Sequence, residues 1–156
     1  MLFIWERHNI PPELEKLGDV TCYFVCERGI KIDNKLYRRQ FIDRDFSSFI
    51  AEVHQKKPVD MVLSYFPGAE ISPETIHKIN AMGIATFSFY WDDRLCFHGR
   101  KIGGQWSGPV SVCTAYDLNL TNAPESLVKY KVEGALAMFW PEAANPEYFC
   151  HREMPF

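Results

Sequence analysis

The residues of this sequence best placed for chemistry are two adjacent carboxylates, Asp92 and Asp93, which end the run IATFSFYWDD (84–93). The apolar, β-branched and aromatic part of this run is typical of a strand buried on both faces of a parallel sheet. Ligands of open α/β sheets bind outside the carboxyl ends of the strands, where the pair would lie. The pair could act as a general base, hold a sugar hydroxyl or bind a metal. The pattern is equally compatible with a structural role, in which one carboxylate caps the next turn and the other is solvated.

Two further segments are weaker candidates for binding a ligand. Phe66, Pro67 and Gly68 end another expected strand, so their backbone amides could cradle a ligand at the same edge. Ser126 and Tyr130 lie four residues apart, which places them on one face of an expected helix. The amino end of that helix would offer free amides and a partial positive charge. A plain turn and a well-capped structural helix are the structural alternatives.

The elements that would position these residues alternate between strands and helices along the chain. Expected strands cover residues 2–5, 20–26, 59–66, 84–93, 117–121 and 135–140. Expected helices cover residues 13–17, 45–56, 73–82 and 126–133, and a short one residues 110–116. This alternation predicts an α/β fold, namely a Rossmann-like three-layer domain with a mostly parallel, doubly wound sheet.

Local signals refine three connections between these elements. Residues 29–41 alternate apolar and polar around an Asp-Asn pair, which predicts a hairpin or an excursion at the sheet edge. Residues 95–109 contain four glycines and are expected to form a long binding or mobile loop. Asn122 and Glu125 have the spacing of a capping box for the helix that follows.

Length and composition restrict the classes of protein. The chain has 156 residues, of which 47% are hydrophobic, as expected for one globular domain. The net charge of -3 argues against a nucleic-acid partner, which usually requires a basic surface. The aromatic share of 15% exceeds what a small core needs, so we expect some rings to line a groove.

The sequence lacks the motifs that would indicate a bound nucleotide, a zinc ion or a secreted protein. The sequence lacks the glycine motifs of dinucleotide-binding and ATP-binding loops. The five cysteines are irregularly spaced and do not supply two close pairs of zinc ligands, so we expect no metal and no tightly bound cofactor. The apolar amino end is too short for a signal peptide or a membrane span, and a reducing cytoplasm is the expected location.

Several short motifs occur in an order that resembles a known family. YWDD (90–93), AYDLNLT (115–121), SLVKY (126–130) with Gly134, and FWPEAANPEYF (139–149) together resemble the amino-terminal domain of CgeB-like, spore-protein type glycosyltransferases. The resemblance covers about residues 59–149. It implies one half of a GT-B fold, in which two Rossmann-like domains enclose a cleft. The amino-terminal domain of such enzymes shapes the acceptor site, and the carboxy-terminal domain holds most of the nucleotide-sugar donor.

The resemblance also implies roles for individual residues. In an inverting transfer, Asp92 or Asp93 would deprotonate the acceptor hydroxyl, and Asp92 is the first choice. In a retaining transfer, the pair would only orient the substrate. Tyr90, Trp91 and Trp106 would offer flat faces for stacking against sugars. GT-B transferases generally need no bound metal.

The expected site therefore has a catalytic pair, Asp92 and Asp93, and a substrate-binding set. That set consists of Phe66, Pro67, Gly68, Tyr90, Trp91, Trp106, Asn122, Ser126 and Tyr130. Residues 1–156 would form a single acceptor-side domain, inactive alone, whose partners are a glycan or small-molecule acceptor and an absent donor-binding domain. The chain would then be a fragment or a natural half-enzyme. Two alternatives stay open: a non-catalytic module that binds a glycan, a nucleotide or a protein, and a homodimer that rebuilds a cleft.

Overall fold

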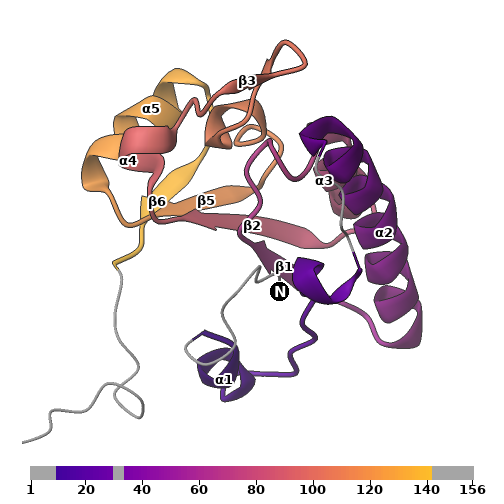
Figure 1. Ribbon diagram of the computed structural model, residues 1–156. Coiled ribbons are helices and arrows are strands. Elements are labelled where there is room, and N and C mark those ends of the chain that lie inside the picture. Colours follow the sequence, from indigo (N-terminus) through magenta and orange to yellow (C-terminus); the bar gives the residue numbers. More distant parts are fainter. Residues whose placement is uncertain (1–9, 30–33, 142–156) are drawn as a thin grey trace, which may run out of the picture.

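The computed structural model describes residues 10–29 and 34–141. Its centre is a four-stranded parallel sheet with the strand order β1-β2-β5-β6 (Figure 1). The strands are β1 (Met61–Ser64), β2 (Ala85–Tyr90), β5 (Leu118–Thr121) and β6 (Ala137–Phe139). Tyr90 lies opposite Thr121, and Thr121 lies opposite Phe139. All four carboxyl ends therefore gather at one edge of the sheet.

Helices lie on both faces of this sheet (Figure 1). The helices are α1 (Ile10–Glu15), α2 (Lys35–Lys56), α3 (Pro73–Asn80), α4 (Asp93–Cys96) and α5 (Leu127–Val132). Three short 3-10 turns are η1 (Val25–Glu27), η2 (Pro109–Ser111) and η3 (Pro124–Ser126). A small antiparallel hairpin joins β3 (Lys101–Ile102) to β4 (Gln105–Trp106).

Strand alternation separates the two hydrophobic clusters that cover β1, one on each face, and a third cluster consists of Tyr90, Phe97, Cys113 and Tyr130. The larger cluster unites α2 and α3 with β1, and Phe46 and Phe66 are in edge contact at its centre. The cluster on the other face contains Leu63, Phe89 and Leu120, against which α1 packs. Because both faces of the sheet are covered with apolar side chains, its strands are apolar on both sides.

The predicted α/β class and the parallel sheet are confirmed, because β1, β2, β5 and β6 lie within four of the expected strands. A doubly wound sheet requires a reversal of strand order, and the order of the described strands runs in one direction. The strand expected at residues 2–5, which could supply the reversal, lies outside the described residues.

Two predictions for the first third of the chain are wrong. Residues 20–26 do not form a strand, since only Tyr23 makes an isolated bridge and η1 follows it directly. The hairpin expected at residues 29–41 is replaced from residue 34 onward by the start of α2. Asn34 caps that helix, because its Oδ1 accepts hydrogen bonds from the amides of Leu36 and Tyr37.

Predictions for three later connections also need correction. The expected loop at residues 95–109 contains the β3–β4 hairpin, whose turn residues Gly103 and Gly104 both have positive φ, as a type I′ turn requires. The helix expected at residues 110–116 is reduced to the single turn η2. The capping box does not form: Ala123, not Asn122, precedes η3, and no side chain caps the turn.

Candidate functional site

Asp93 lies inside the protein at the carboxyl edge of the sheet. Its side chain is 1% exposed, and both carboxylate oxygens accept hydrogen bonds. Thr121 Oγ1 donates to Oδ1 at 2.9 Å, and the Tyr130 hydroxyl donates to Oδ2 at 2.9 Å. Burial, reinforced by the charge of Asp93, raises the pKa of Tyr130, so the phenol remains a donor. Asp93 therefore ties α4 to the end of β5 and to α5.

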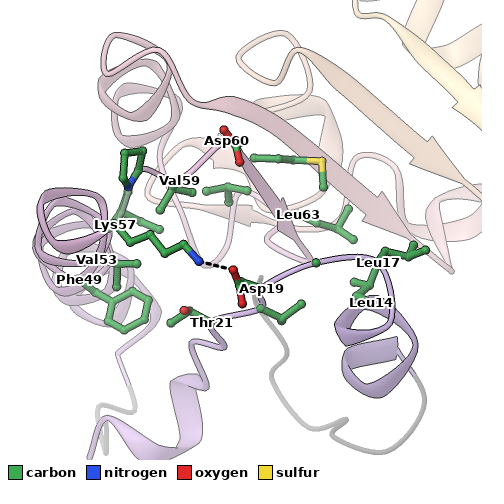
Figure 2. Close-up of a pocket in the computed structure, with 16 residues that line it drawn as sticks. Leu14, Leu17, Asp19, Thr21, Phe49, Val53, Lys57, Val59, Asp60 and Leu63 are labelled. Atoms are coloured by element: carbon green, nitrogen blue, oxygen red, sulfur yellow. Dashed lines mark hydrogen bonds and ion pairs between the residues drawn. The ribbon is translucent and has the colours of Figure 1, made fainter.

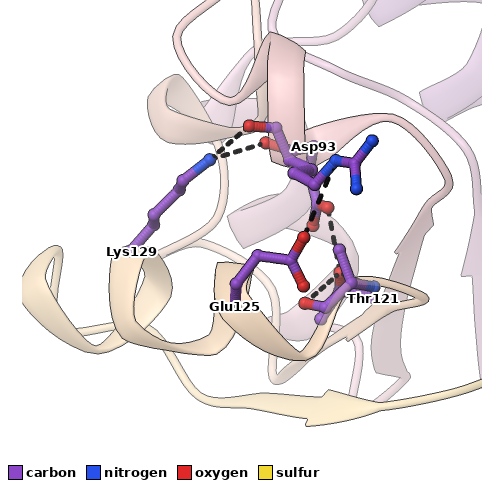
Figure 3. A network of polar contacts seen from close by, with 6 residues as sticks. Asp93, Thr121, Glu125 and Lys129 are labelled. Carbon is purple, nitrogen blue, oxygen red and sulfur yellow. Dashed lines mark hydrogen bonds and ion pairs between the residues drawn. The ribbon is translucent and has the colours of Figure 1, made fainter.

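A lysine strengthens the same junction from the surface. Lys129 Nζ donates to the backbone carbonyls of Asp93 at 3.2 Å and Arg94 at 2.6 Å (Figure 3). On the adjacent turn, Arg94 and Glu125 form an exposed ion pair at 3.6 Å. The ammonium group thus binds the backbone carbonyls of the first two residues of α4 and brings positive charge close to the buried carboxylate of Asp93.

Asp92 has the opposite environment. It is exposed and precedes α4, and its backbone carbonyl accepts from the amides of Leu95 at 3.1 Å and Cys96 at 2.8 Å. Its side chain makes no capping hydrogen bond. The carboxylate of Asp92 therefore faces solvent at the carboxyl edge, where it can accept a proton from a bound hydroxyl.

The two aromatic residues before the acidic pair also differ. Trp91 is half-buried, and its ring centre lies 5.4 Å from that of Tyr65 and 5.5 Å from that of Phe89. Tyr90 is 3% exposed, and its hydroxyl donates to the backbone carbonyl of Phe66 at 2.6 Å. Tyr90 thus connects the ends of β1 and β2, whereas Trp91 is only partly buried.

The turn at Phe66, Pro67 and Gly68 packs closely against the β3–β4 hairpin. The Gly68 amide donates to the Gly108 carbonyl at 3.2 Å, so it is not available to a ligand. Arg39 Nη1 donates to the Gly68 carbonyl and to Gln105 Oε1, both at 3.1 Å. The turn is therefore a structural junction that fixes the hairpin beside the carboxyl end of β1.

Trp106 lies on this hairpin and is 39% exposed. The His98 ring contacts it edge to face, with ring centres 5.3 Å apart. Lys101 Nζ lies 5.0 Å from the centre of the indole ring. Trp106 therefore belongs to a basic, aromatic surface that adjoins β1, while Asp92 follows β2.

Asn122 and Ser126 carry unused hydrogen-bonding atoms just beyond β5. Asn122 Oδ1 and Ser126 Oγ are buried and have no hydrogen-bond partner among the described residues. Both atoms are shielded from solvent, so a ligand at the surface does not reach them in this conformation. Asn122 emerges next to Trp91 and Asp92 because Tyr90 and Thr121 are opposite each other in the sheet.

The structure thus brings Asp92, Asp93, Trp91, Asn122 and the Ser126–Tyr130 turn together at the ends of β2 and β5. Phe66, Pro67, Gly68 and Trp106 gather separately beside the end of β1. Sequence reasoning missed Thr121 and Lys129 as partners of the Asp93 segment. No local signal could have found them, because the contacts join residues that are 28 and 36 positions apart.

A cavity lies elsewhere, beside β1. It has a volume of about 360 Å³, and residues of α1, α2 and β1 line it (Figure 2). Asp19 and Lys57 form an ion pair beside it. None of the predicted site residues lines this cavity.

Within residues 10–29 and 34–141, no three His, Cys, Asp or Glu side chains gather as metal ligands would. Over the same ranges, no helix has both the length and the apolar character needed to cross a membrane. Comparisons with protein-family models, characterised proteins and solved structures found no match to this chain.

Proposed function

We propose that this chain is the acceptor-binding, amino-terminal domain of a nucleotide-sugar-dependent glycosyltransferase of the GT-B type. The order of the motifs from YWDD to FWPEAANPEYF supports this family. The parallel sheet with its carboxyl ends at one edge is compatible with a Rossmann-like half of such an enzyme. The observation that carries the proposal is the acidic pair, in which an exposed Asp92 adjoins a buried, hydrogen-bonded Asp93.

In the proposed mechanism, Asp92 is the general base of an inverting transfer. Its carboxylate takes the proton of an acceptor hydroxyl while that oxygen attacks the anomeric carbon of the donor. The bond from the anomeric carbon to the nucleoside diphosphate breaks, and the diphosphate leaves on the side of the donor-binding domain. Asp93 is a positioning residue, because its oxygens are occupied by Thr121 and Tyr130. Trp91 and Asn122 would bind the acceptor sugar.

One observation favours a second candidate, a non-catalytic glycan-binding module on the same edge. A half-buried tryptophan beside the half-buried Asn122 would bind a sugar without any proton transfer. In that case Asp92 would only accept a hydrogen bond from the ligand.

Replacement of Asp92 by Asn tests the catalytic proposal in a protein that contains this domain together with a donor-binding domain. We expect kcat for sugar transfer to fall about 10²–10⁴-fold, because the amide cannot take the proton. The matched control is Asp60→Asn, which changes an exposed aspartate at the opposite end of the sheet. It should leave kcat and the circular dichroism spectrum unchanged.

Two outcomes separate the candidates. Unchanged transfer by the Asp92→Asn protein would eliminate Asp92 as the base. If the unsubstituted protein binds acceptor glycans, with amide shifts at Trp91 and Asn122, but transfers no sugar from any nucleotide-sugar tested, the binding module is correct.

A further inference from the structure

Arg39 is half-buried and is held in place by one nitrogen of its guanidinium group. Nη1 donates to the Gly68 carbonyl and to Gln105 Oε1, both at 3.1 Å, which occupies both of its hydrogens. In the part of the chain that the structure describes, Nε and Nη2 have no hydrogen-bond or ion-pair partner. These two nitrogens form an edge that can bind two oxygens of one carboxylate or phosphate group. Arg39 thus presents an anion-binding edge whose position is already fixed.

Three elements build the surroundings of this edge. Arg39 is in the second turn of α2, Gly68 follows β1, and Gln105 belongs to the β3–β4 hairpin. The tip of the hairpin also lies against α2, since a Cβ at Gly103 would be 3.9 Å from Leu36 Cδ2. The fold therefore fixes the guanidinium group at the carboxyl end of β1, where ligands of open α/β sheets bind.

A second unpaired cation lies on the same ridge of α2. Lys35 precedes Arg39 by one helical turn, and residues at this spacing are neighbours on a helix surface. Lys35 is exposed and has no ion pair with any described residue, whereas Arg38 is paired with Glu70 at 3.1 Å. Like charges at this spacing destabilise a helix, and cations in its first turn oppose the helix dipole. In a chain of net charge -3, this positive surface is a local exception that a bound anion would neutralise.

We propose that Arg39 and Lys35 bind the acid group, a phosphate or a carboxylate, of a small ligand at the carboxyl edge of the sheet. Arg39 would hold two oxygens through Nε and Nη2, and Lys35 would add the attraction of a point charge. The first amides of α2 take no part, because Asn34 Oδ1 accepts from them. One fixed guanidinium group and one lysine match a single acid group, whereas a nucleic acid requires a basic stripe.

The exposed cation of the hairpin lies on another surface. Ile102 is opposite Gln105, and Lys101 is opposite Trp106. Because successive residues of a strand point to opposite faces, Lys101 and Trp106 share the face that Gln105 does not occupy. The acid group bound by Arg39 would therefore lie on the α2 side of the hairpin, away from the indole ring.

The site adjoins the proposed catalytic edge. Ser64 lies opposite Ser88 in the sheet, and Gly68 and Asp92 follow these residues by the same number of positions. The acid group would thus bind at the end of β1 while Asp92 follows the neighbouring strand β2. Its assignment to the acceptor rests on the proposed function and implies that the acceptor is an acidic sugar. Binding of the anion itself does not depend on sugar transfer.

Titration of the unmodified full chain with glucose 6-phosphate, glucuronate and neutral glucose tests the site at constant ionic strength. We expect the acidic sugars to shift the NMR signal of Arg39 Nε–H and glucose to leave it unchanged. A larger response to glucose 6-phosphate would identify a phosphate ligand, and a larger response to glucuronate a carboxylate ligand. No shift with either acidic sugar, or an equal shift with glucose, would overturn the proposal.

Substitutions separate anion binding from a purely structural role of Arg39. Arg39→Lys keeps the charge but loses the paired donors, so we expect Kd for the acidic sugar to rise at least about 10-fold. Arg39→Gln should weaken binding further, and the matched control Arg44→Gln, at an exposed arginine of α2, should leave Kd unchanged. Equal Kd values for Arg39→Gln and Arg44→Gln would refute the site.

Two features of the design keep its outcome clear. If Arg39→Gln does not fold, Arg39→Lys and the Nε–H signal of the unmodified chain decide. The titration contains no sugar donor, so absence of binding would overturn this inference alone. Failure of the Asp92→Asn test would overturn the catalytic proposal and would leave a measured anion site standing.

Discussion

Adjacent aspartates acquire different chemistry here because a helix begins between them. Asp92 ends the turn after β2 and remains in water, while Asp93 is the first residue of α4 and points into the protein. A buried carboxylate is costly unless its oxygens are hydrogen-bonded, and Thr121 and Tyr130 supply one donor each. Only the Asp92 carboxylate is therefore accessible to solvent, and the hydrogen bonds of Asp93 hold the start of α4 in place beside it.

Removal of one donor to Asp93 should be measurable as lost stability. We expect Tyr130→Phe to lower the free energy of unfolding by about 1.5–3 kcal/mol, since a buried carboxylate oxygen loses its partner. Urea unfolding monitored by tryptophan fluorescence gives this quantity. The control is Tyr37→Phe, which removes the hydroxyl of a residue that is 61% exposed. Equal stability of the two variants would show that Tyr130 does not support the carboxylate.

At the scale of elements, the β3–β4 hairpin is fixed by close backbone packing rather than by an apolar core. Ser107 and Gly108 donate to the carbonyls of Arg100 at 2.9 Å and His98 at 3.0 Å, and the Gly108 carbonyl accepts from the Gly68 amide. Only glycine fits at position 108, because a Cβ there would lie 2.3 Å from the Phe97 carbonyl oxygen and 2.5 Å from that of Cys96.

Gly108→Ala should therefore disturb the junction between the hairpin and the end of α4. We expect a loss of about 1–3 kcal/mol of unfolding free energy, because the contacts are with backbone atoms that cannot rotate away. The matched control is Gly18→Ala, where nothing lies within 4 Å of the added methyl group. A Gly108→Ala protein that is as stable as Gly18→Ala would contradict the packing seen at this position.

Across the whole molecule, buried tyrosine hydroxyls and one cysteine thiol make the free energy of unfolding depend on pH at alkaline pH. Burial raises the pKa of Tyr90, Tyr116 and Tyr130, and it raises the pKa of Cys113 to about 11. These acids stay neutral in the folded protein at a pH where the unfolded chain already releases their protons. Their contribution is complete below about pH 8, where the unfolded thiol and phenols still hold their protons, and is lost as the pH rises through the folded values.

We accordingly expect the free energy of unfolding to decline above about pH 10, by up to about 1.4 kcal/mol per pH unit for each buried phenol. Urea midpoints at pH 8, 9, 10 and 10.5 measure this decline. Tyr116→Phe should make the decline with pH shallower, since it removes one of the buried phenols whose pKa is raised. A stability that is constant from pH 8 to pH 10.5 would show that the phenols are accessible to water in the folded state.

The sequence pattern predicts the four central strands, because a parallel strand covered on both faces must be apolar throughout, and such runs are visible locally. It also located the exposed Asp92 at a strand end. Residues 34–41 were misassigned because their alternation is compatible with a strand, and only packing of Ile42, Phe46 and Ile50 against the sheet extends α2 across them.

Three features are visible only in the folded protein: the burial of Asp93, the hydrogen bond from the Gly68 amide to the Gly108 carbonyl, and the cavity beside β1. Each of these depends on contacts between residues far apart in the chain, and local propensity carries no information about such contacts. The physical reason is that hydrogen-bond partners and apolar walls are set by strand register and by the side of the sheet on which each helix crosses.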